Sequence, residues 1–554
     1  MPHLKRHRTR PVPRQVPIPR SGLVPERAGR NARPVDDWAR LDRFLVLGSE
    51  LGCYRASEWT PTRANAQALE RCIRADGRRA VAQIVRVSDA GRAPRNDPAL
   101  FGLAMAAGLG DADTRRTSLD ALPRVAPTAS DLFQFAAFVD GFRGWGRSLR
   151  RAVGQWYAAQ PVDALAYEAV TCRRRAGVAH RDLLRRAHPA RRVSAGNPTL
   201  AVTPDHERLF DWIVRGGTCD GLPRLVEGFA RAQASASPAE TAALVAEYGL
   251  PREAVRSDHL GSAAVWAALL DDMPVATMLR SLATMTRVGV LAPGSAGAAT
   301  VAARLGDAGR IRRARLHPVG VLAALRAYAA GRGLRGPRRW EPVAEVVDAL
   351  DAAFATAFGN VEPTGRRLLL ALDVSVSMAW GNVAGVQGLT PREAAASMAL
   401  VTAATEPRHE IVGFCAGGWF RDRGRDRHPG LPDGLTRLRI SPSQRLDDAV
   451  RACQDLRFGG TDCALPMLYA RALEREVDTF VVYTDSDTWT GDVHPVQALR
   501  DYRRASGIDA RLVVVGMVSN GFAIADPADA GMLDVVGFDT ATPQLIGDFA
   551  RGAL

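Results

Sequence analysis

The chain lacks the features expected of a secreted or membrane-bound protein. Its seven cysteines show no C-x-x-C spacing and no paired framework, which is typical of proteins in a reducing compartment. The first residues include no apolar signal-peptide core, and no uninterrupted apolar run is long enough to span a bilayer. We therefore predict a cytoplasmic protein with no membrane segment.

The chain also lacks the common sequence signatures of enzymes. It has no P-loop G-x-x-x-x-G-K, no convincing G-x-G-x-x-G after a strand and no Ser-His-Asp ordering. Nothing in its motifs requires catalysis, so we predict a protein that is not an enzyme.

Lysine is almost absent, and the charge is uneven along the chain. Lys5 is the only lysine among 73 basic residues. Codon bias in a GC-rich genome accounts for this choice, so the charge and not the residue type carries the functional information. Residues 366–554 hold 20 arginines against 24 acidic residues, whereas residues 1–365 hold 53 basic against 35 acidic residues. A polyanionic partner is therefore expected to bind the first part of the chain.

Length and composition predict more than one domain. A chain of 554 residues is too long for a single core, and 47% hydrophobic residues are ample for globular burial. Residues 1–33 are rich in proline and arginine and are predicted to be a disordered basic arm. Residues 34–360 show helical periodicity throughout, as in Leu149, Val153 and Trp156. Stacked helix pairs of the HEAT kind would absorb this length, and an irregular all-helical domain is the alternative.

Residues 361–554 change to an alternation of strands and helices. The predicted strands cover 367–374, 410–415, 479–484, 511–517 and 534–538. The predicted helices cover 392–404, 444–456, 464–476, 495–505 and 543–551. Continuous apolar strands between helices predict a Rossmann-like α/β domain, with a parallel sheet covered on both faces. Ligands of such sheets bind beyond the carboxyl ends of the strands.

Five oxygen-bearing side chains fall at these strand ends. Asp373, Ser375 and Ser377 form a D-x-S-x-S motif after the first strand, Thr461 follows two glycines, and Asp485 ends the strand over 479–484. Mg²⁺ favours a few oxygen ligands of this kind and keeps several waters. We predict that the five residues hold Mg²⁺. The alternative for the D-x-S-x-S motif is an Asx turn or a helix N-cap.

Two carboxylates among five ligands limit the chemistry of this site. A two-metal nuclease needs more carboxylates to hold two dications and orient water. Of two nearby acids, Asp462 stands at a helix start, where it suits the helix dipole, and Asp487 is either a second-layer or a solvent-facing residue. The predicted site leaves one coordination position for an outside acidic ligand.

Basic residues cluster in three places of the helical region. The densest cluster contains Arg173, Arg174, Arg175, His180, Arg181, Arg185, Arg186 and His188. A second group places Arg147, Arg150 and Arg151 beside Trp145 and Trp156. A third contains Arg312, Arg313, Arg315, His317, Arg332, Arg335, Arg338 and Arg339. Several arginines on one face neutralise phosphates, and tryptophans stack on single-stranded bases. The alternatives are a solvated charged face, with His180 as a helix cap, and tryptophans packed in the core.

These motifs resemble two known modules. The D-x-S-x-S, Gly-Gly-Thr and strand-Thr-Asp set resembles the metal-ion-dependent adhesion site of von Willebrand factor A domains. The segments 361–365 (VEPTG), 459–467 (GGTDCALPM) and 517–527 (MVSNGFAIADP) are similar to the Ro autoantigen family, whose helical module is called TROVE. The likeness continues in the helical region at 41–45, 48–50, 145–150, 180–185, 273–274 and 315–318.

The resemblance implies a ring of HEAT-like repeats closed by the A domain. It implies a monomeric protein that binds Y-like small non-coding RNA on the outer surface of the ring and takes single-stranded ends of misfolded RNA into its hole. It also implies a partner, a 3′-to-5′ exoribonuclease of the polynucleotide phosphorylase kind, in RNA quality control. The RNA contacts expected on this basis are Arg173, Arg174, Arg175, His180, Arg181, Arg185, Arg147 and Arg150.

Two stretches depart from the family pattern, and two other functions remain open. Residues 193–205 are shorter and less helical than expected, and residues 417–440 form a longer loop rich in arginine and aspartate. The first alternative function is a metal-dependent adhesion or assembly protein without an RNA role, against which the charge asymmetry argues. The second is a Mg²⁺-dependent nuclease.

Overall fold

The computed structural model describes most of the chain. It covers residues 24–25, 31–32, 36–50, 53–55, 61–91, 93–189, 202–216, 221–333, 337–383, 388–415, 434–454, 461–485, 493–518, 524–526 and 529–553. The prediction for the basic arm falls outside these residues, apart from β1 (Val24–Pro25) and β2 (Asn31–Ala32), which pair antiparallel. Gly459, Gly460 and Asp487 also lie outside them. No helix within the described ranges is long and apolar enough to cross a bilayer.

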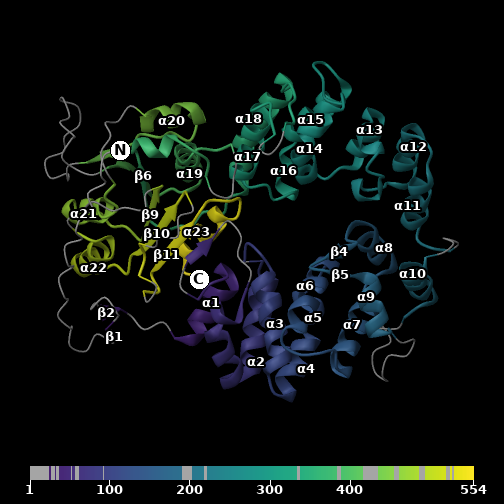
Figure 1. Cartoon of the computed structure of the whole chain (residues 1–554). Helices are drawn as coiled ribbons and strands as arrows, with labels where there is room; N and C mark the ends of the chain where they lie inside the picture. Colours follow the sequence, from purple (N-terminus) through teal and green to yellow (C-terminus); the bar gives the residue numbers. More distant parts are fainter. Residues whose placement is uncertain are drawn as a thin grey trace, which may run out of the picture.

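The first part of the chain is a row of helices that curves into a ring (Figure 1). Its first half contains α1 (Asp37–Leu47), α2 (Gln67–Asp89), α3 (Asp97–Leu109), α4 (Ala112–Asp120), α5 (Leu122–Val125), α6 (Ala129–Asp140), α7 (Arg147–Ala159), α8 (Val162–Thr171) and α9 (His180–Ala187). Its second half contains α10 (Pro204–Arg215), α11 (Arg224–Ala234), α12 (Pro238–Tyr248), α13 (Ala263–Asp272), α14 (Val275–Arg287), α15 (Ala296–Gly306), α16 (Ala308–Arg313), α17 (Pro318–Ala329) and α18 (Ala344–Thr356). The predicted helical-repeat ring is therefore confirmed.

Apolar residues three or four positions apart hold this row together. On α7 they are Leu149, Val153 and Trp156, all of which are buried against neighbouring helices. Burying an aliphatic side chain of this size contributes about 1.5–3 kcal/mol, so each helix is stabilised mainly by its packed face. The periodicity in the sequence thus predicts both the helices and the faces that they bury.

The helical region is not helical throughout, which corrects the sequence prediction. The strands β4 (Arg174–Arg175) and β5 (Val178–Ala179) form a hairpin, and β3 (Cys53–Arg55) is a third strand of this region. Ala176 and Gly177 both have positive φ, as a two-residue hairpin turn requires. Strands of two or three residues are too short for an alternating pattern to reveal them.

The C-terminal part is an α/β domain built on one sheet, as predicted. Its strands are β6 (Leu368–Asp373), β7 (His409–Phe414), β8 (Leu435–Arg437), β9 (Thr479–Thr484), β10 (Arg511–Gly516) and β11 (Met532–Val536). Its helices are α19 (Pro391–Thr405), α20 (Leu446–Gln454), α21 (Leu465–Ala472), α22 (Pro495–Ser506) and α23 (Thr542–Arg551). The strand order is β3-β11-β10-β9-β6-β7-β8. All pairs are parallel except β7 with β8, which makes the sheet mixed and corrects the prediction of a purely parallel sheet.

Both ends of the helical ring contact the C-terminal α/β domain (Figure 1). At the first end β3 extends the sheet beside β11, and Arg43 of α1 donates a hydrogen bond to the carbonyl oxygen of Asp529 at 2.9 Å. At the other end Arg326 of α17 lies 3.1 Å from both Glu393 and Asp447. The domain therefore closes the ring through backbone pairing on one side and ion pairs on the other.

A candidate cation site and a candidate RNA surface

The five predicted cation ligands converge at the carboxyl edge of the sheet. Asp373 ends β6 and is almost fully buried, and the Thr461 hydroxyl donates to its Oδ2 at 3.0 Å. The hydroxyl oxygens of Ser375 and Ser377 lie 3.0 Å apart. Ser377 Oγ donates to Asp485 Oδ1 at 3.1 Å. At one edge of the sheet, one hydrogen bond thus joins Thr461 to Asp373, and two others join Ser375 to Ser377 and Ser377 to Asp485.

Burial and hydrogen bonding oppose one another at Asp373. Burial raises the pKa of this carboxyl, the hydroxyl of Thr484 and the backbone N–H of Ser375 lower it, and the charge of Asp485 raises it. Thr484 Oγ1 donates to Asp373 Oδ2 at 2.7 Å, and the Ser375 N–H donates to Oδ1 at 2.8 Å. The second of these bonds is an Asx-type contact, so the turn that we considered as the alternative is present together with the ligand cluster.

The donor set fits one small divalent cation. Two carboxylates and three hydroxyls are all oxygen donors, as Mg²⁺ prefers. No three His, Cys, Asp or Glu side chains gather into a metal cage within the described ranges, so hydroxyls would supply much of the coordination here. The Asp462 carboxylate instead accepts a hydrogen bond from the Ala464 N–H at 3.0 Å, just before α21 begins.

Two residues of this site were missed by sequence reasoning. Thr484 precedes Asp485, and its place as the last residue of an apolar strand was the signal that could have revealed it. Arg392 of α19 is buried, and its Nη2 donates to the Ser375 carbonyl oxygen at 2.9 Å. Arg392 holds the backbone of the motif from a different element, and no local pattern indicates such a contact.

Exposed arginines of α7 and α9 form the candidate RNA surface. The two helices pack against one another, and Arg147, Arg150, Arg181 and Arg185 are all exposed on them. Among the residues that the structure describes, none of these four arginines forms an ion pair. Arg186 differs, since it lies 3.4 Å from Asp140 and stacks over the Trp145 ring at 5.1 Å. The sequence predicted this group of arginines, and the structure leaves four of them open to a polyanion.

The β4–β5 hairpin presents the remaining predicted arginines. Arg173 lies over the ring of Phe229 at 4.7 Å, and Arg174 Nη2 donates to the Gly177 carbonyl oxygen at 3.2 Å. Arg175 Nη1 donates to Ser130 Oγ at 2.6 Å. All three side chains are exposed, so they add positive charge beside α9, although Arg175 also lies 3.7 Å from Asp97.

His180 lies in the packing beneath this surface. Only 3% of it is exposed, its Nδ1 is 2.9 Å from the Tyr157 hydroxyl, and its ring lies 4.8 Å from that of Phe133. Burial lowers the pKa of His180 to about 4, so the ring is neutral at neutral pH. A side chain buried this deeply does not offer the direct RNA contact that we predicted. It anchors the start of α9 instead.

The tryptophans of the second basic group pack rather than present a stacking surface. Trp156 is 1% exposed, and its Nε1 donates to the Ala126 carbonyl oxygen at 2.7 Å. Trp145 is partly buried, donates to Asp140 Oδ1 at 2.7 Å and is covered by Arg186. For Trp156 the alternative interpretation, core packing, is the one that the structure shows.

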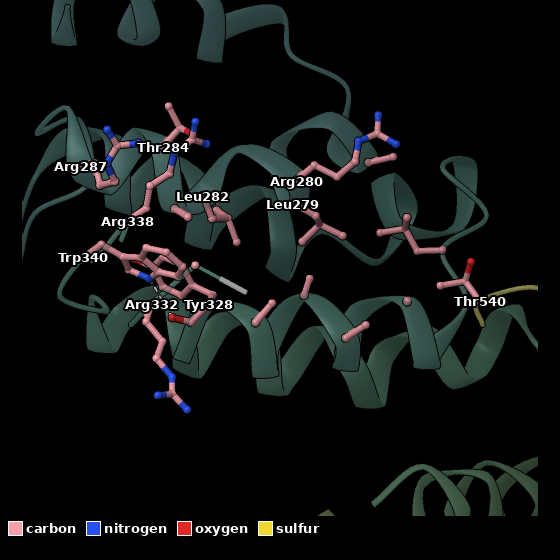
Figure 2. A pocket seen from close by; sticks show the side chains of 18 of the residues that line it. Leu279, Arg280, Leu282, Thr284, Arg287, Tyr328, Arg332, Arg338, Trp340 and Thr540 are labelled. Carbon is pink, nitrogen blue, oxygen red and sulfur yellow. Dashed lines mark hydrogen bonds between the residues drawn. The ribbon is translucent and has the colours of Figure 1, made fainter. Parts of the chain in front are cut away.

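The third basic group contributes to a groove between α14 and α17 (Figure 2). Arg315, His317, Arg332 and Arg338 line it, and Arg335 lies outside the described residues. Two further lining arginines come from α14 and had not been singled out in the sequence; they are Arg280 and Arg287.

The fold and the site define the class of this protein, a ring of helical repeats closed by a von Willebrand factor A-type domain. The TROVE domain family matches residues 24–211 and 249–329, and the Ro60 vWA domain family matches residues 367–550. The chain belongs to the Ro family, as its motifs predicted.

Relatives of this family resemble the chain over nearly its whole length. The RNA-binding protein RO60 of Deinococcus radiodurans is 42% identical over 531 residues, which cover 96% of this chain and 95% of the relative. The RNA-binding protein RO60 of Caenorhabditis elegans is 33% identical over 614 residues, covering 98% and 92%. The crystal structure of the Deinococcus radiodurans RO (RSR) protein superposes with a TM-score of 0.84 at 41% identity, covering 94% of this chain and all of that one.

Proposed function

We propose that this protein is an RNA-binding scaffold whose ring binds a Y-like small non-coding RNA through α7, α9 and the β4–β5 hairpin. The observation that carries the proposal is the exposed arginines, of which Arg147, Arg150, Arg181 and Arg185 have no ion pair among the described residues. The relatives named RNA-binding protein support it. Structured RNA is bound mainly through its shape, phosphates and 2′-hydroxyls, which suits guanidinium groups better than base-specific contacts.

The test is RNA affinity after neutralising two arginines of this surface. Arg181→Gln combined with Arg185→Gln removes two phosphate contacts. Each such contact contributes roughly 0.9 to the slope of log affinity against log salt on a duplex, so the slope should fall by about 1.8. Fluorescence anisotropy with a labelled Y-like hairpin RNA over a salt series measures this change.

The matched control is Arg86→Gln combined with Arg124→Gln. These substitutions remove the same charge from the ring. Each of the two arginines, however, is already paired with a carboxylate, Arg86 with Asp42 and Arg124 with Asp89. The control should bind the hairpin as the unchanged protein does. Equal losses in both double variants would show that net charge alone attracts the RNA and would contradict a specific surface on α7 and α9.

In the same proposal the ring also takes single-stranded ends of misfolded RNA and delivers them to a 3′-to-5′ exoribonuclease of the polynucleotide phosphorylase kind. The proposed setting is the cytoplasm, with one copy of the chain in each ribonucleoprotein. The family relationship supports this part, and the basic ring adjoining the A-type domain gives it a structural basis. Co-purification of the nuclease with the tagged protein, lost after RNase treatment or after removal of the Y-like RNA, would test it.

We propose further that Asp373, Ser375, Ser377, Thr461 and Asp485 hold Mg²⁺ as a docking point for an acidic group of a partner. The bound cation would supply a positive charge for a carboxylate ligand. Val376 and Trp380 flank Ser377 and are among the exposed large apolar residues, 45% and 71% exposed, which favours a protein contact at this edge. With only two carboxylates, the site is poorly suited to a two-metal nuclease.

A further inference from the structure

A groove of about 780 Å³ runs between α14 and α17 on the arm of the ring next to the A-type domain (Figures 1 and 2). Trp340 and Tyr328 lie at one end of the groove in Figure 2, and Thr540 of the A-type domain lies at the other. Leu279 and Leu282 of α14 form part of its apolar wall. Its volume falls within the roughly 300–1,000 Å³ that is usual for ligand sites.

The charged lining of this groove has one sign. The lining includes five arginines and no aspartate or glutamate; the arginines are Arg280, Arg287, Arg315, Arg332 and Arg338. All five are exposed, and none forms an ion pair among the residues that the structure describes. By contrast Arg326, on α17 itself, does not line the groove and is paired with Glu393 and Asp447. The groove therefore keeps positive charge that no described carboxylate of the chain neutralises.

An aromatic ring is held rigidly at the end of the groove. The Nε1 of Trp340 donates to the Tyr328 carbonyl oxygen at 2.8 Å, a bond drawn in Figure 2, and its backbone N–H donates to the Gly331 carbonyl oxygen at 3.0 Å. The Tyr328 hydroxyl is itself fixed, 2.9 Å from Thr286 Oγ1 and 3.2 Å from the Val343 N–H. A partly buried indole that is already fixed loses little conformational freedom when a ligand stacks on it.

Two of the arginines lie at the same end as this ring. In Figure 2 Arg287, Arg338 and Thr284 lie toward the same end of the groove as Trp340, whereas Arg280 lies further along α14 and the side chain of Arg332 points away from the groove. An aromatic ring and two guanidinium groups at the same end of a groove suit a base joined to phosphates. Single-stranded nucleic acids are held in this way, by stacking of bases and by neutralisation of the backbone.

We propose that this groove binds a nucleotide of a single RNA strand, with its base against Trp340 and its phosphates at Arg287 and Arg338. Arg280, which lies further along α14 in Figure 2, would then meet a phosphate further along the strand. The inference rests on the proposed function and deepens it, since it adds a second RNA site on the arm of the ring opposite α7 and α9 (Figure 1). The occupant is a strand segment with little base preference, because every base has a stacking face.

Binding of a labelled single-stranded oligoadenylate to the full-length protein tests the groove. Arg287→Gln combined with Arg338→Gln should weaken binding about tenfold and lower the salt slope by about 1.4, at roughly 0.7 for each phosphate of a single strand. Arg312→Gln combined with Arg313→Gln is the matched control, because these exposed arginines of α16 do not line the groove. The control should retain the affinity and the slope of the unchanged protein.

Substitution of the tryptophan tests the stacking. Trp340→Leu should weaken oligoadenylate binding about tenfold, whereas Trp340→Phe, which keeps an aromatic face, should retain most of it. Trp340→Leu also removes a hydrogen bond that fixes the ring. If Trp340→Leu does not fold, Trp340→Phe and the double variant of Arg287 and Arg338 still test the proposal.

Competition separates the possible ligands. Adenosine monophosphate shares the base and the phosphate, and displacement of the strand by micromolar amounts would assign the groove to a free nucleotide and overturn the RNA strand. Oligoglutamate carries negative charge but no base. If it displaces the strand equally well from the unchanged protein, from Trp340→Phe and from Trp340→Leu, the groove is a plain anion site and the proposed stacking on Trp340 is wrong. Weak competition by both probes is the expected result.

The two RNA proposals fail separately. If the Arg287 and Arg338 variant binds oligoadenylate normally while the Arg181 and Arg185 variant loses the hairpin RNA, the groove proposal is wrong and the outer surface stands. If neither double variant changes binding of its own RNA, both proposals are wrong.

Discussion

Arginine has different roles in the A-type domain and in the ring. In the domain, Arg503 lies 2.6 Å from Asp529, and Arg500 lies 3.0 Å from Asp526, with all four side chains largely buried. In the ring, Arg181 and Arg185 are exposed and unpaired among the described residues. A buried charge requires a partner because its desolvation is costly, whereas an exposed charge remains available for a polyanion. Arg500 and Arg503 are thus structural, whereas Arg181 and Arg185 remain available for recognition.

The largest effect is expected at the proposed cation site. Asp373→Ala should abolish Mg²⁺ binding, because it removes the deeply buried one of the two carboxylates. The RNA affinity should stay within about twofold, because the proposed RNA surfaces are on the ring. Isothermal titration with Mg²⁺ and anisotropy with the hairpin RNA measure the two quantities. Asp211→Ala, on the exposed face of α10, is the control and should change neither. A parallel loss of RNA affinity would contradict the separation of the two regions.

The next effect concerns the structural arginines. Burial raises the pKa of Asp529, but Arg503, together with the Gly531 N–H and Arg500, holds this pKa below the usual value. Arg503→Gln leaves that carboxylate without its main partner and should lower the free energy of unfolding by about 3 kcal/mol. The adjacent Arg504, 63% exposed and 3.5 Å from Asp501, provides the control, and Arg504→Gln should cost under about 0.5 kcal/mol. Urea denaturation distinguishes the two variants.

The two regions should also respond in opposite directions to pH. Burial raises the pKa of Asp534 to about 7, so its contribution to stability is present at acidic pH and is lost as pH rises between about 4 and 7. Burial lowers the pKa of His180 to about 4, so its contribution is present above pH 6.5 and is lost as pH falls toward 4. At 1.36 kcal/mol per pKa unit, the whole change is about 4 kcal/mol for Asp534, whose pKa rises from 3.8 to about 7, and about 3 kcal/mol for His180, whose pKa falls from 6.5 to about 4. Between pH 5 and pH 7 alone, each contribution changes by about 2 kcal/mol.

Variants assign each part of this pH dependence. Asp534→Asn should be more stable than the unchanged protein at pH 8, and His180→Phe should lose less stability between pH 7 and pH 5. His317, whose pKa burial also lowers to about 4, changes in the same direction as His180, so part of the acid sensitivity should remain. Denaturation at pH 5, 7 and 8 measures these differences. Variants whose pH profiles match that of the unchanged protein would contradict the assignment.

The smallest effect is expected where recognition is proposed. Arg181→Gln combined with Arg185→Gln should change the free energy of unfolding by less than about 0.5 kcal/mol per site. Neither arginine forms an ion pair among the residues that the structure describes. Thermal denaturation of the variant that has weakened RNA affinity tests this directly. A loss of several kcal/mol would mean that these arginines are structural, like those of the A-type domain.

Local motifs allowed much of the fold and the residues of the candidate cation site to be predicted. The strand that ends at Asp373 and the strand that precedes Asp485 are apolar runs, and parallel strands bring their carboxyl ends to one edge. The antiparallel strand β8 and the hairpin carrying Arg174 were missed, because strands of two or three residues have too short a pattern. The burial of His180 was missed because a histidine near several arginines in the sequence gives the same local signal whether it faces RNA or the core.

The sequence by itself determined the helical periodicity, the oxygen-bearing side chains at the strand ends and the excess of basic charge in the ring. Each of these is a property of neighbouring residues. Only the tertiary structure decided that β3 joins the sheet of the A-type domain and that α14 and α17 enclose a groove beside Trp340. Those features depend on contacts between residues far apart in the chain. The packing of such residues is set by shape and burial rather than by any local pattern.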